Sequence, residues 1–214
     1  MDAVEKRVRL TYSKHAPIRF TSILDVQKIW ERTFRRAGIP LAYSQGFHPQ
    51  AKIQQASPLP LGFCGEGEII DVWIEPTPEN LLEINLINPY LPIGMEIHQI
   101  EQIAPASRSL QQYVDFSDYS IIFLGLLSGN TATTLAENIL KEKSIIFTKH
   151  NGKQYDLKPL IKSVNVQEQE LSLCISLSSA PGATGRPDHI LQYFHYDPSY
   201  TLITRKKIHF LGYD

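Results

Sequence analysis

The chain has 214 residues, of which 43% are hydrophobic and 20% are charged, and its formal net charge is −1. This composition is ordinary for a globular protein, and the length allows one large domain or two of about 100 residues each. No stretch approaches the roughly 18 apolar residues of a membrane span, and residues 1–10 lack the apolar run of a signal peptide. The two cysteines lie far apart in the sequence, which suits a reducing compartment. We therefore expect a cytoplasmic protein that does not bind a membrane.

The small net charge hides a strong separation of charge along the chain. Residues 1–60 hold ten Lys and Arg against four Asp and Glu, whereas residues 61–142 hold two against twelve. Residues 143–214 hold nine against six. Such a separation indicates a molecule with two unlike faces, and the alternative is solvated surface charge without a partner.

The first half of the chain predicts the element order βαββαβ. Residues 6–14 alternate apolar and polar side chains, which is typical of a half-buried strand. Residues 21–38 carry an apolar stripe at helical spacing, with Ser22 as N-cap, Asp25 in a capping box and Gly38 after the last turn. The remaining elements are strands at 53–57 and 65–75, a short helix at 77–91 and a strand at 94–103.

The second half repeats this order with one extra hairpin strand, although no repeat is visible in the sequence itself. The hairpin is predicted by the turn Asn151–Gly152. A βαββαβ unit closes naturally as a ferredoxin-like sheet with two helices on one face. We predict an α+β protein of two tandem ferredoxin-like units with antiparallel sheets, at residues 1–104 and 112–214, joined by a linker at 105–111.

The sequence lacks the residue patterns that usually support catalysis. No GxSxG is present, and the seven histidines form neither HxxxH nor HExxH, the spacings of common zinc sites. The glycines of residues 62–67 match neither GxGxxG nor a phosphate-binding P-loop, and no cysteine cluster for an iron–sulfur centre exists. We therefore expect no enzymatic activity, no metal and no cofactor.

Residues 41–63 form the segment that most strongly indicates a binding site. The segment holds aromatic, imidazole and basic groups, two glycines and three prolines, but no acid. A turn-rich loop would expose Phe47 and His48 beside Lys52, which suits stacking on a base and contact with its phosphate. The alternative is that Phe47 anchors the loop in the core while His48 caps a backbone carbonyl.

Basic side chains of the first helix predict a second part of the same surface. The basic face opposite the apolar stripe can contact a phosphate backbone or an acidic protein, and its members at helical spacing are Lys28, Arg32, Arg35 and Arg36. The alternative is a solvated helix face with Glu31 paired to Arg35. His15 and Arg19, in the first strand–helix connection, are expected to add a second basic loop. The predicted partner- or RNA-binding residues are Arg32, Arg35, Arg36, Phe47, His48, Lys52, His15 and Arg19.

An acidic band on the strand that follows is expected to be structural. Charge on a strand edge discourages pairing with other chains, so we expect this band to face water. Its members are Glu66, Glu68, Asp71 and Glu75.

Four motifs of the first half carry a family resemblance. They are RRAGIP at 35–40, YSQGFHP at 43–49, SPLPLG at 57–62 and the acidic strand at 66–71. Together they resemble the radical-SAM-linked family, a domain of unknown function encoded beside, or fused behind, a radical SAM enzyme. The resemblance implies a role in RNA metabolism, because neighbouring genes of the family often include an endonuclease of the ribonuclease E/G type. It supplies no catalytic residue.

These observations lead to three hypotheses about function. The first is a non-catalytic adaptor or regulator that binds an RNA-processing or RNA-modifying enzyme, either of the ribonuclease E/G type or a radical SAM protein. The second is an RNA-binding module that presents tRNA or rRNA to a radical SAM enzyme. The third is an enzyme that uses His48 as a general base. We favour the adaptor.

Overall fold

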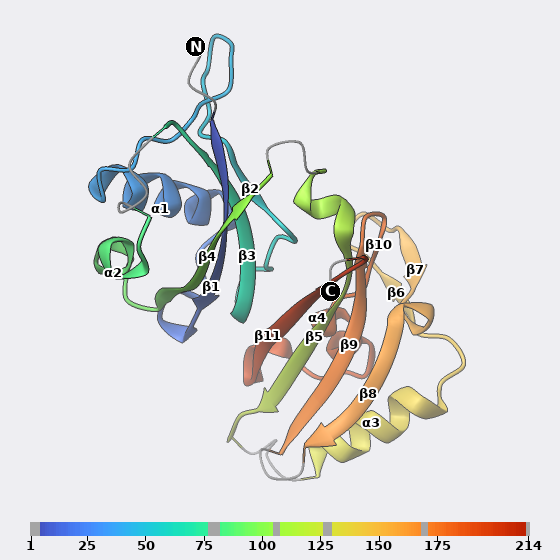
Figure 1. Cartoon of the computed structure of the whole chain (residues 1–214). Helices are drawn as coiled ribbons and strands as arrows, with labels where there is room; N and C mark the ends of the chain where they lie inside the picture. The colour runs from blue at the N-terminus through green and yellow to red at the C-terminus, as the bar shows by residue number, and fades with distance from the viewer. Residues whose placement is uncertain (1–4, 77–81, 105–107, 126–129, 168–170, 213–214) are drawn as a thin grey trace. The chain divides into compact units, whose positions relative to one another are not determined.

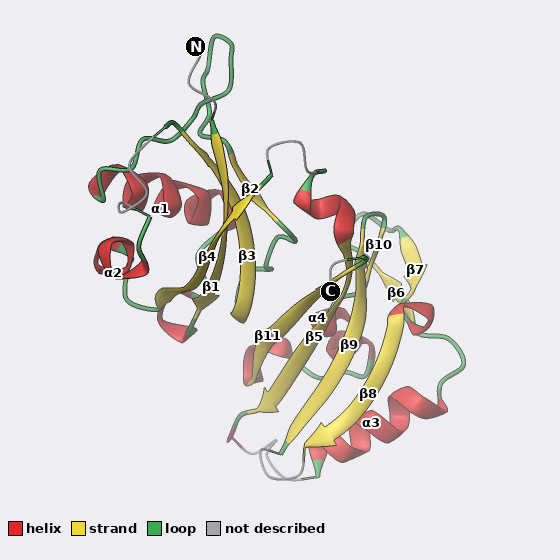
Figure 2. Ribbon diagram, in the orientation of Figure 1, coloured by secondary structure: helices red, strands yellow, loops and turns green. Residues whose placement is uncertain are grey.

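The chain has a mixed α+β fold with mostly antiparallel sheets (Figures 1 and 2). It divides into two compact units, Met1–Gln112 and Tyr113–Asp214, here called unit 1 and unit 2. In this division the residues expected to form a linker belong to unit 1. Four α-helices lie within the part of the chain that the computed structural model describes, which is residues 5–76, 82–104, 108–125, 130–167 and 171–212.

Unit 1 is a four-stranded antiparallel sheet with its helices on one face (Figure 1). Its strands lie in the order β2–β3–β1–β4, so the two strands in the middle are β1 and β3. The elements are β1 (Lys6–Lys14), α1 (Ile23–Arg36), β2 (Ile53–Gln55), β3 (Cys64–Ile74), α2 (Ile84–Ile87) and β4 (Met95–Ile103).

The boundaries of α1 follow from local signals. The Ser22 hydroxyl oxygen accepts a hydrogen bond from the Asp25 backbone N–H at 3.2 Å and donates to the Asp25 carboxylate at 2.7 Å. The helix stops before Gly38, whose φ of +74° is a conformation that glycine adopts without strain. The predicted cap and stop of this helix are therefore confirmed.

The second helix of unit 1 is shorter than its predicted span of 77–91. Among the described residues α2 covers only Ile84–Ile87, and a 3-10 helix η3 (Asn88–Tyr90) follows it; residues 77–81 lie outside the described residues. The Asn88 side chain bonds both backbone groups of Ile97 on β4, at 2.8 and 3.2 Å. This clamp holds the chain against the sheet where Pro89 ends the α-helix.

The core of unit 1 lies between α1 and the sheet and is centred on Trp30. The Trp30 side chain is fully buried, and its ring meets Tyr12 of β1 edge to face at 4.9 Å and Phe34 at 6.0 Å. Residues of β1 and β3 complete the core from the sheet, including Leu10 and Ile70. Each Å² of apolar surface that this core removes from water stabilises the fold by roughly 25 cal/mol.

Substitution of Trp30 should reveal how much this core contributes. We expect Trp30→Ala to lower the free energy of unfolding by about 3 to 5 kcal/mol, because it leaves a large cavity. Trp30→Phe should cost less, since it keeps much of the volume and removes an indole N–H that has no hydrogen-bond partner in the described part of the chain. Urea unfolding measures both values. An alanine variant as stable as the parent would contradict the central role of Trp30.

Unit 2 has a sheet in which β9 is flanked by β8 and β10 on one side and by β5 on the other, with β11 beside β5. A separate antiparallel hairpin, β6–β7, turns at Asn151–Gly152 as predicted, with Gly152 at a φ of +78°. The elements are β5 (Val114–Phe123), α3 (Thr131–Lys141), β6 (Ile146–Thr148), β7 (Gln154–Asp156), β8 (Ile161–Gln167), β9 (Ser172–Ala180), β10 (Ala183–Thr184), α4 (Pro187–Tyr193) and β11 (Thr201–Phe210).

Among the helices of the described ranges, none has the length and apolar character that crossing a membrane requires.

Candidate functional site

The segment between α1 and β2 forms an ordered stem with a projecting tip, which we call the 43–51 loop. Tyr43 and Ala51 are bridged across its base. Above them the Ser44 backbone N–H donates to the Gln50 carbonyl at 2.8 Å, and the Gln50 N–H donates to the Ser44 hydroxyl at 3.0 Å. These bonds hold the two sides of the loop together, so the tip is carried on a defined stem.

The tip places an aromatic ring entirely in solvent. Phe47 is 102% exposed, and the neighbouring His48 is also exposed. Gly46, on the other side of Phe47, has a φ of +130°, which allows the sharp change of direction at the tip. The alternative expectation, that Phe47 anchors the loop in the core, is therefore wrong.

Arg35 lies at the base of this loop. It lines a hollow of about 400 Å³ together with Tyr43, Pro40 and Glu75. The Tyr43 hydroxyl donates to the Glu31 carboxylate at 3.4 Å, and burial followed by the Glu31 charge raises the pKa of Tyr43. Glu31 thus contacts Tyr43, and no Glu31–Arg35 ion pair occurs among the residues that the structure describes.

Arg32 and Arg36 are exposed on the same helix but line a different hollow. This second hollow, the α1–η3 groove, has a volume of about 330 Å³ and lies between α1 and the segment Pro89–Pro92. The basic face of α1 thus has two edges. One edge meets the 43–51 loop through Arg35, and the other meets the groove.

Lys52 is engaged within unit 1. Its ammonium group lies 2.7 and 2.9 Å from the two carboxylate oxygens of Glu5, and both side chains are about one-third exposed, at 34% and 40%. The predicted cation beside the tip is therefore partly neutralised by an acid that lies just before β1.

His15 and Arg19 lie at the opposite end of unit 1. The 43–51 loop lies beside the start of β1, whereas His15 follows the end of this nine-residue strand, about 30 Å away at 3.3 Å per residue. The His15 N–H donates to the Gly94 carbonyl at 2.7 Å, and the Arg19 guanidinium lies over the Phe20 ring at 4.8 Å. The structure does not bring these two residues to the predicted surface.

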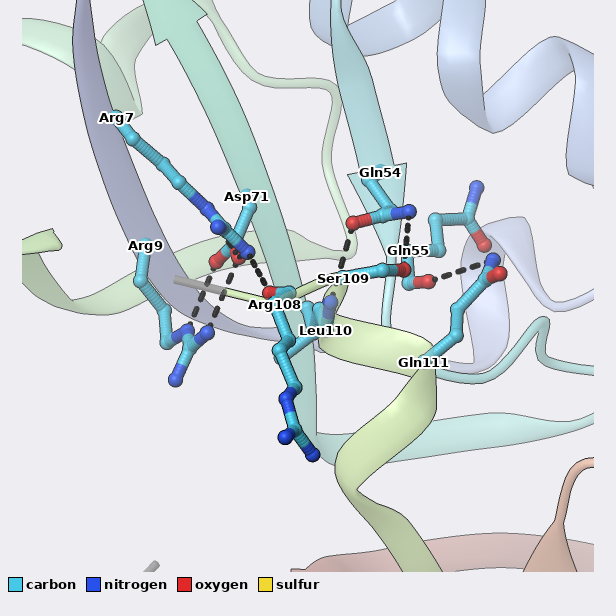
Figure 3. A network of polar contacts seen from close by, with 9 residues as sticks. All are labelled: Arg7, Arg9, Gln54, Gln55, Asp71, Arg108, Ser109, Leu110 and Gln111. Carbon is cyan, nitrogen blue, oxygen red and sulfur yellow. Dashed lines mark hydrogen bonds and ion pairs between the residues drawn. The ribbon is translucent and has the colours of Figure 1, made fainter. Parts of the chain in front are cut away.

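A buried ion cluster replaces the water-facing acidic edge that the sequence predicts. Asp71 is fully buried on the central strand β3, and its carboxylate accepts four hydrogen bonds from two arginines of β1 (Figure 3). Arg7 donates to one oxygen at 2.6 and 3.0 Å, and Arg9 bonds both oxygens at 2.8 and 3.0 Å. Glu68 is only 2% exposed, so the expectation of a solvated band fails for these two acids.

The described part of the expected linker, residues 108–111, is fastened to this cluster and to β2 (Figure 3). Arg7 donates to the Arg108 carbonyl at 3.0 Å. The Gln54 amide donates to the Ser109 hydroxyl at 2.8 Å and accepts from the Leu110 N–H at 3.2 Å. These hydrogen bonds tie residues 108–110 to unit 1, and the Leu110 side chain is fully buried.

Removal of the central carboxylate should be severely destabilising. We expect Asp71→Ala to lower the free energy of unfolding by about 3 to 5 kcal/mol, because both guanidinium groups lose the buried charge that they share. The matched control is Glu5→Ala, which breaks the partly exposed pair with Lys52 and should cost less than about 1 kcal/mol. Denaturant titration compares the two variants, and equal losses would show that the cluster is energetically ordinary.

Unit 2 contains a second polar and aromatic cluster that the sequence did not reveal. The Tyr155 hydroxyl lies 2.6 Å from Nδ1 of His189, and the Phe147 ring stacks on His189 with centroids 4.0 Å apart. Burial lowers the pKa of His189 and raises the pKa of Tyr155. The cluster joins the β6–β7 hairpin to α4, so its contacts have a packing role in unit 2.

The metal and thiol chemistry of the described residues is limited. They include no group of three or more His, Cys, Asp and Glu placed to hold a metal ion. Cys64 and Cys174 are free thiols, and burial raises the pKa of the Cys64 thiol, which disfavours the reactive thiolate.

Comparison with known proteins gives one informative match. No curated protein matches the chain. A solved Dyp-type peroxidase-like protein from Shewanella oneidensis aligns with 98% of this chain and 92% of its own, but at 12% identity and a TM-score of 0.23, which supports no argument. The sequence profile of a family described as "Uncharacterized protein conserved in bacteria (DUF2344)" covers residues 7–187. This match spans most of both units, so the chain belongs to the DUF2344 family.

Proposed function

We propose that the chain is a non-catalytic adaptor or regulator in RNA metabolism that binds an enzyme through the end of unit 1 carrying Phe47, His48 and Arg35. The observation that carries this proposal is the full exposure of Phe47 at the tip of a hydrogen-bonded stem. Moving an exposed phenyl ring out of water is favourable in free energy, so an ordered loop that presents such a ring is suited to insertion into a partner.

The chemistry around Phe47 fits a protein interface. Binding energy in such interfaces is concentrated in a few anchors, typically aromatic and arginine side chains that enter pockets of the partner. Here an aromatic tip and an arginine, Arg35, occupy the two ends of one short loop stem. The tip residues next to Phe47 include no Lys, Arg, Asp or Glu, which keeps the desolvation cost of an interface low.

The identity of the partner is proposed from the family resemblance alone. A radical SAM enzyme or a ribonuclease of the E/G type, encoded nearby, is the partner that this resemblance implies. On this proposal the chain acts in the cytoplasm, needs no cofactor and modulates a reaction that the partner catalyses.

We also propose that both units are ferredoxin-like. In unit 1 the element order is βαββαβ and the strands lie in the order β4–β1–β3–β2, all antiparallel. In unit 2 the corresponding strands lie in the order β11–β5–β9–β8, with the β6–β7 hairpin and β10 as additions. The repeated spatial order supports a duplicated architecture that carries different surfaces.

A second candidate is an RNA-binding module that presents tRNA or rRNA to a radical SAM enzyme. The observation that favours it is the exposed arginine set Arg32, Arg35 and Arg36 on the helix beside the aromatic tip. Phosphates contact such cations, and an exposed ring stacks on an unpaired base.

Substitution of the tip tests the adaptor. A partner is first identified by co-purification from native lysate treated with nuclease and is then titrated in purified form. We expect Phe47→Ala to weaken binding by at least about thirty-fold, the loss that corresponds to a hot-spot residue. The matched control is Phe20→Ala, which removes an exposed phenyl ring from the opposite end of unit 1 and should leave affinity unchanged. Equal effects of the two variants would refute the proposed site.

Charge reversal and salt separate the two candidates. The triple change Arg32→Glu, Arg35→Glu and Arg36→Glu should abolish partner binding, while thermal stability changes by only tenths of a kcal/mol per exposed charge. A steep fall of log K with log salt would indicate phosphate contacts and RNA, whereas a protein interface with an apolar centre gives a flatter dependence. Unchanged affinity of the triple variant at low salt would mean that the basic face of α1 is solvated charge.

A further inference from the structure

The α1–η3 groove combines two free guanidinium groups with an apolar wall. Arg32 and Arg36 lie one turn apart on α1, and neither has an ion-pair partner anywhere in the described ranges. Facing them across the hollow is a wall of apolar and aromatic side chains. The wall consists of Pro89, Tyr90, Leu91 and Pro92, and Ile29 of α1 lines the hollow on the side of the arginines.

The groove is held in shape by the fold around it. Pro89 and Pro92 stiffen the η3 segment, because each fixes its own φ. Asn88 ties the start of this segment to β4, and the Thr33 hydroxyl of α1 donates to the Tyr90 carbonyl at 3.4 Å. The two walls therefore belong to different elements and are bonded across the floor, so the hollow of about 330 Å³ is preformed.

We propose that the α1–η3 groove binds an acidic peptide segment of the partner protein, in which a carboxylate is flanked by an apolar side chain. Two like charges one turn apart repel each other, and a shared anion relieves that repulsion. The planar forks of Arg32 and Arg36 match the geometry of a carboxylate, to which each can donate two hydrogen bonds. The apolar neighbour of the carboxylate would cover Leu91 and the prolines.

The wall favours a peptide over RNA. Reading a base requires hydrogen-bonding groups that meet its edges. Among the uncharged side chains that line the groove, the Thr33 hydroxyl is already bonded to the Tyr90 carbonyl, which leaves only the Tyr90 hydroxyl. The volume suits one or two side chains, at the lower end of the range for ligand pockets. This inference rests on the proposed adaptor function and adds a second, chemically defined contact to the one made by Phe47.

The test uses three labelled probes and the full chain. They are a capped peptide of alternating glutamate and leucine, the same peptide with glutamine for glutamate, and an oligouridylate of equal charge. Fluorescence anisotropy at low salt gives the affinities, and ¹H–¹⁵N spectra of the arginine Nε–H groups report contact with Arg32 and Arg36. We expect the glutamate peptide to bind at least about tenfold more tightly than the glutamine peptide, since charge-assisted bonds exceed neutral ones.

Variants of the groove and a matched control locate the contact. Arg32→Gln and Arg36→Gln should each lower the affinity for the glutamate peptide by about tenfold or more. Arg36→Lys should lose less affinity than Arg36→Gln but should not match the parent, because a lysine lacks the planar fork of the guanidinium group. The control is Lys28→Gln, which removes an exposed charge from α1 outside the groove and should change affinity by less than about twofold.

Three results would overturn the inference. They are equal binding of the two peptides, tighter binding of oligouridylate through the same arginines, and a loss in Lys28→Gln as large as the loss in Arg32→Gln. The first and third leave the adaptor untouched, because its test is the dependence of partner binding on Phe47, whereas the second would favour the RNA-binding candidate. If partner affinity falls in Phe47→Ala but is unchanged in Arg32→Gln and Arg36→Gln, the groove is not part of the interface and the proposed contact through Phe47 stands.

Discussion

The buried carboxylate of Asp71 is the constraint on which unit 1 depends. A charge with no access to water must be surrounded by opposite charge, and Arg7 and Arg9 supply it from the neighbouring strand. Arg9 lies directly opposite Asp71 in the register of β1 and β3. A slip of one residue would turn Asp71 towards Trp30, so the ion cluster fixes the register that also forms the core on the other face.

The elements of the chain were largely predictable, because their signals are local. The alternation of residues 6–14, the Ser22 cap and the Asn151–Gly152 turn each act over a few residues and gave the correct element. The burial of the charged face of β1 was not predictable in this way. A period of two shows that the faces of a strand differ, but it does not show whether the polar face meets water or an ion pair from residue 71.

The candidate site was predictable only in part. The turn-rich composition of residues 41–63 was compatible with both an exposed and an anchored Phe47, and the structure shows the exposed one. The pairing of Lys52 with Glu5 joins residues distant in the chain and carries no local signal. The separation of His15 from the tip follows from the length of β1, which places its two ends on opposite sides of the unit. The α1–η3 groove is a product of tertiary packing, since its two walls are contributed by segments about 60 residues apart in the sequence.

The fastening of residues 108–111 determines where the chain can be divided. A fragment that ends at residue 104 would leave the Gln54 amide without Ser109 and Leu110 and the Arg7 guanidinium without the Arg108 carbonyl. A fragment that keeps these bonds extends to Gln112, the last residue of unit 1. The same boundary applies to gene fusion, because a foreign domain joined before this point would displace part of the first unit, whereas one joined after it would leave unit 1 whole.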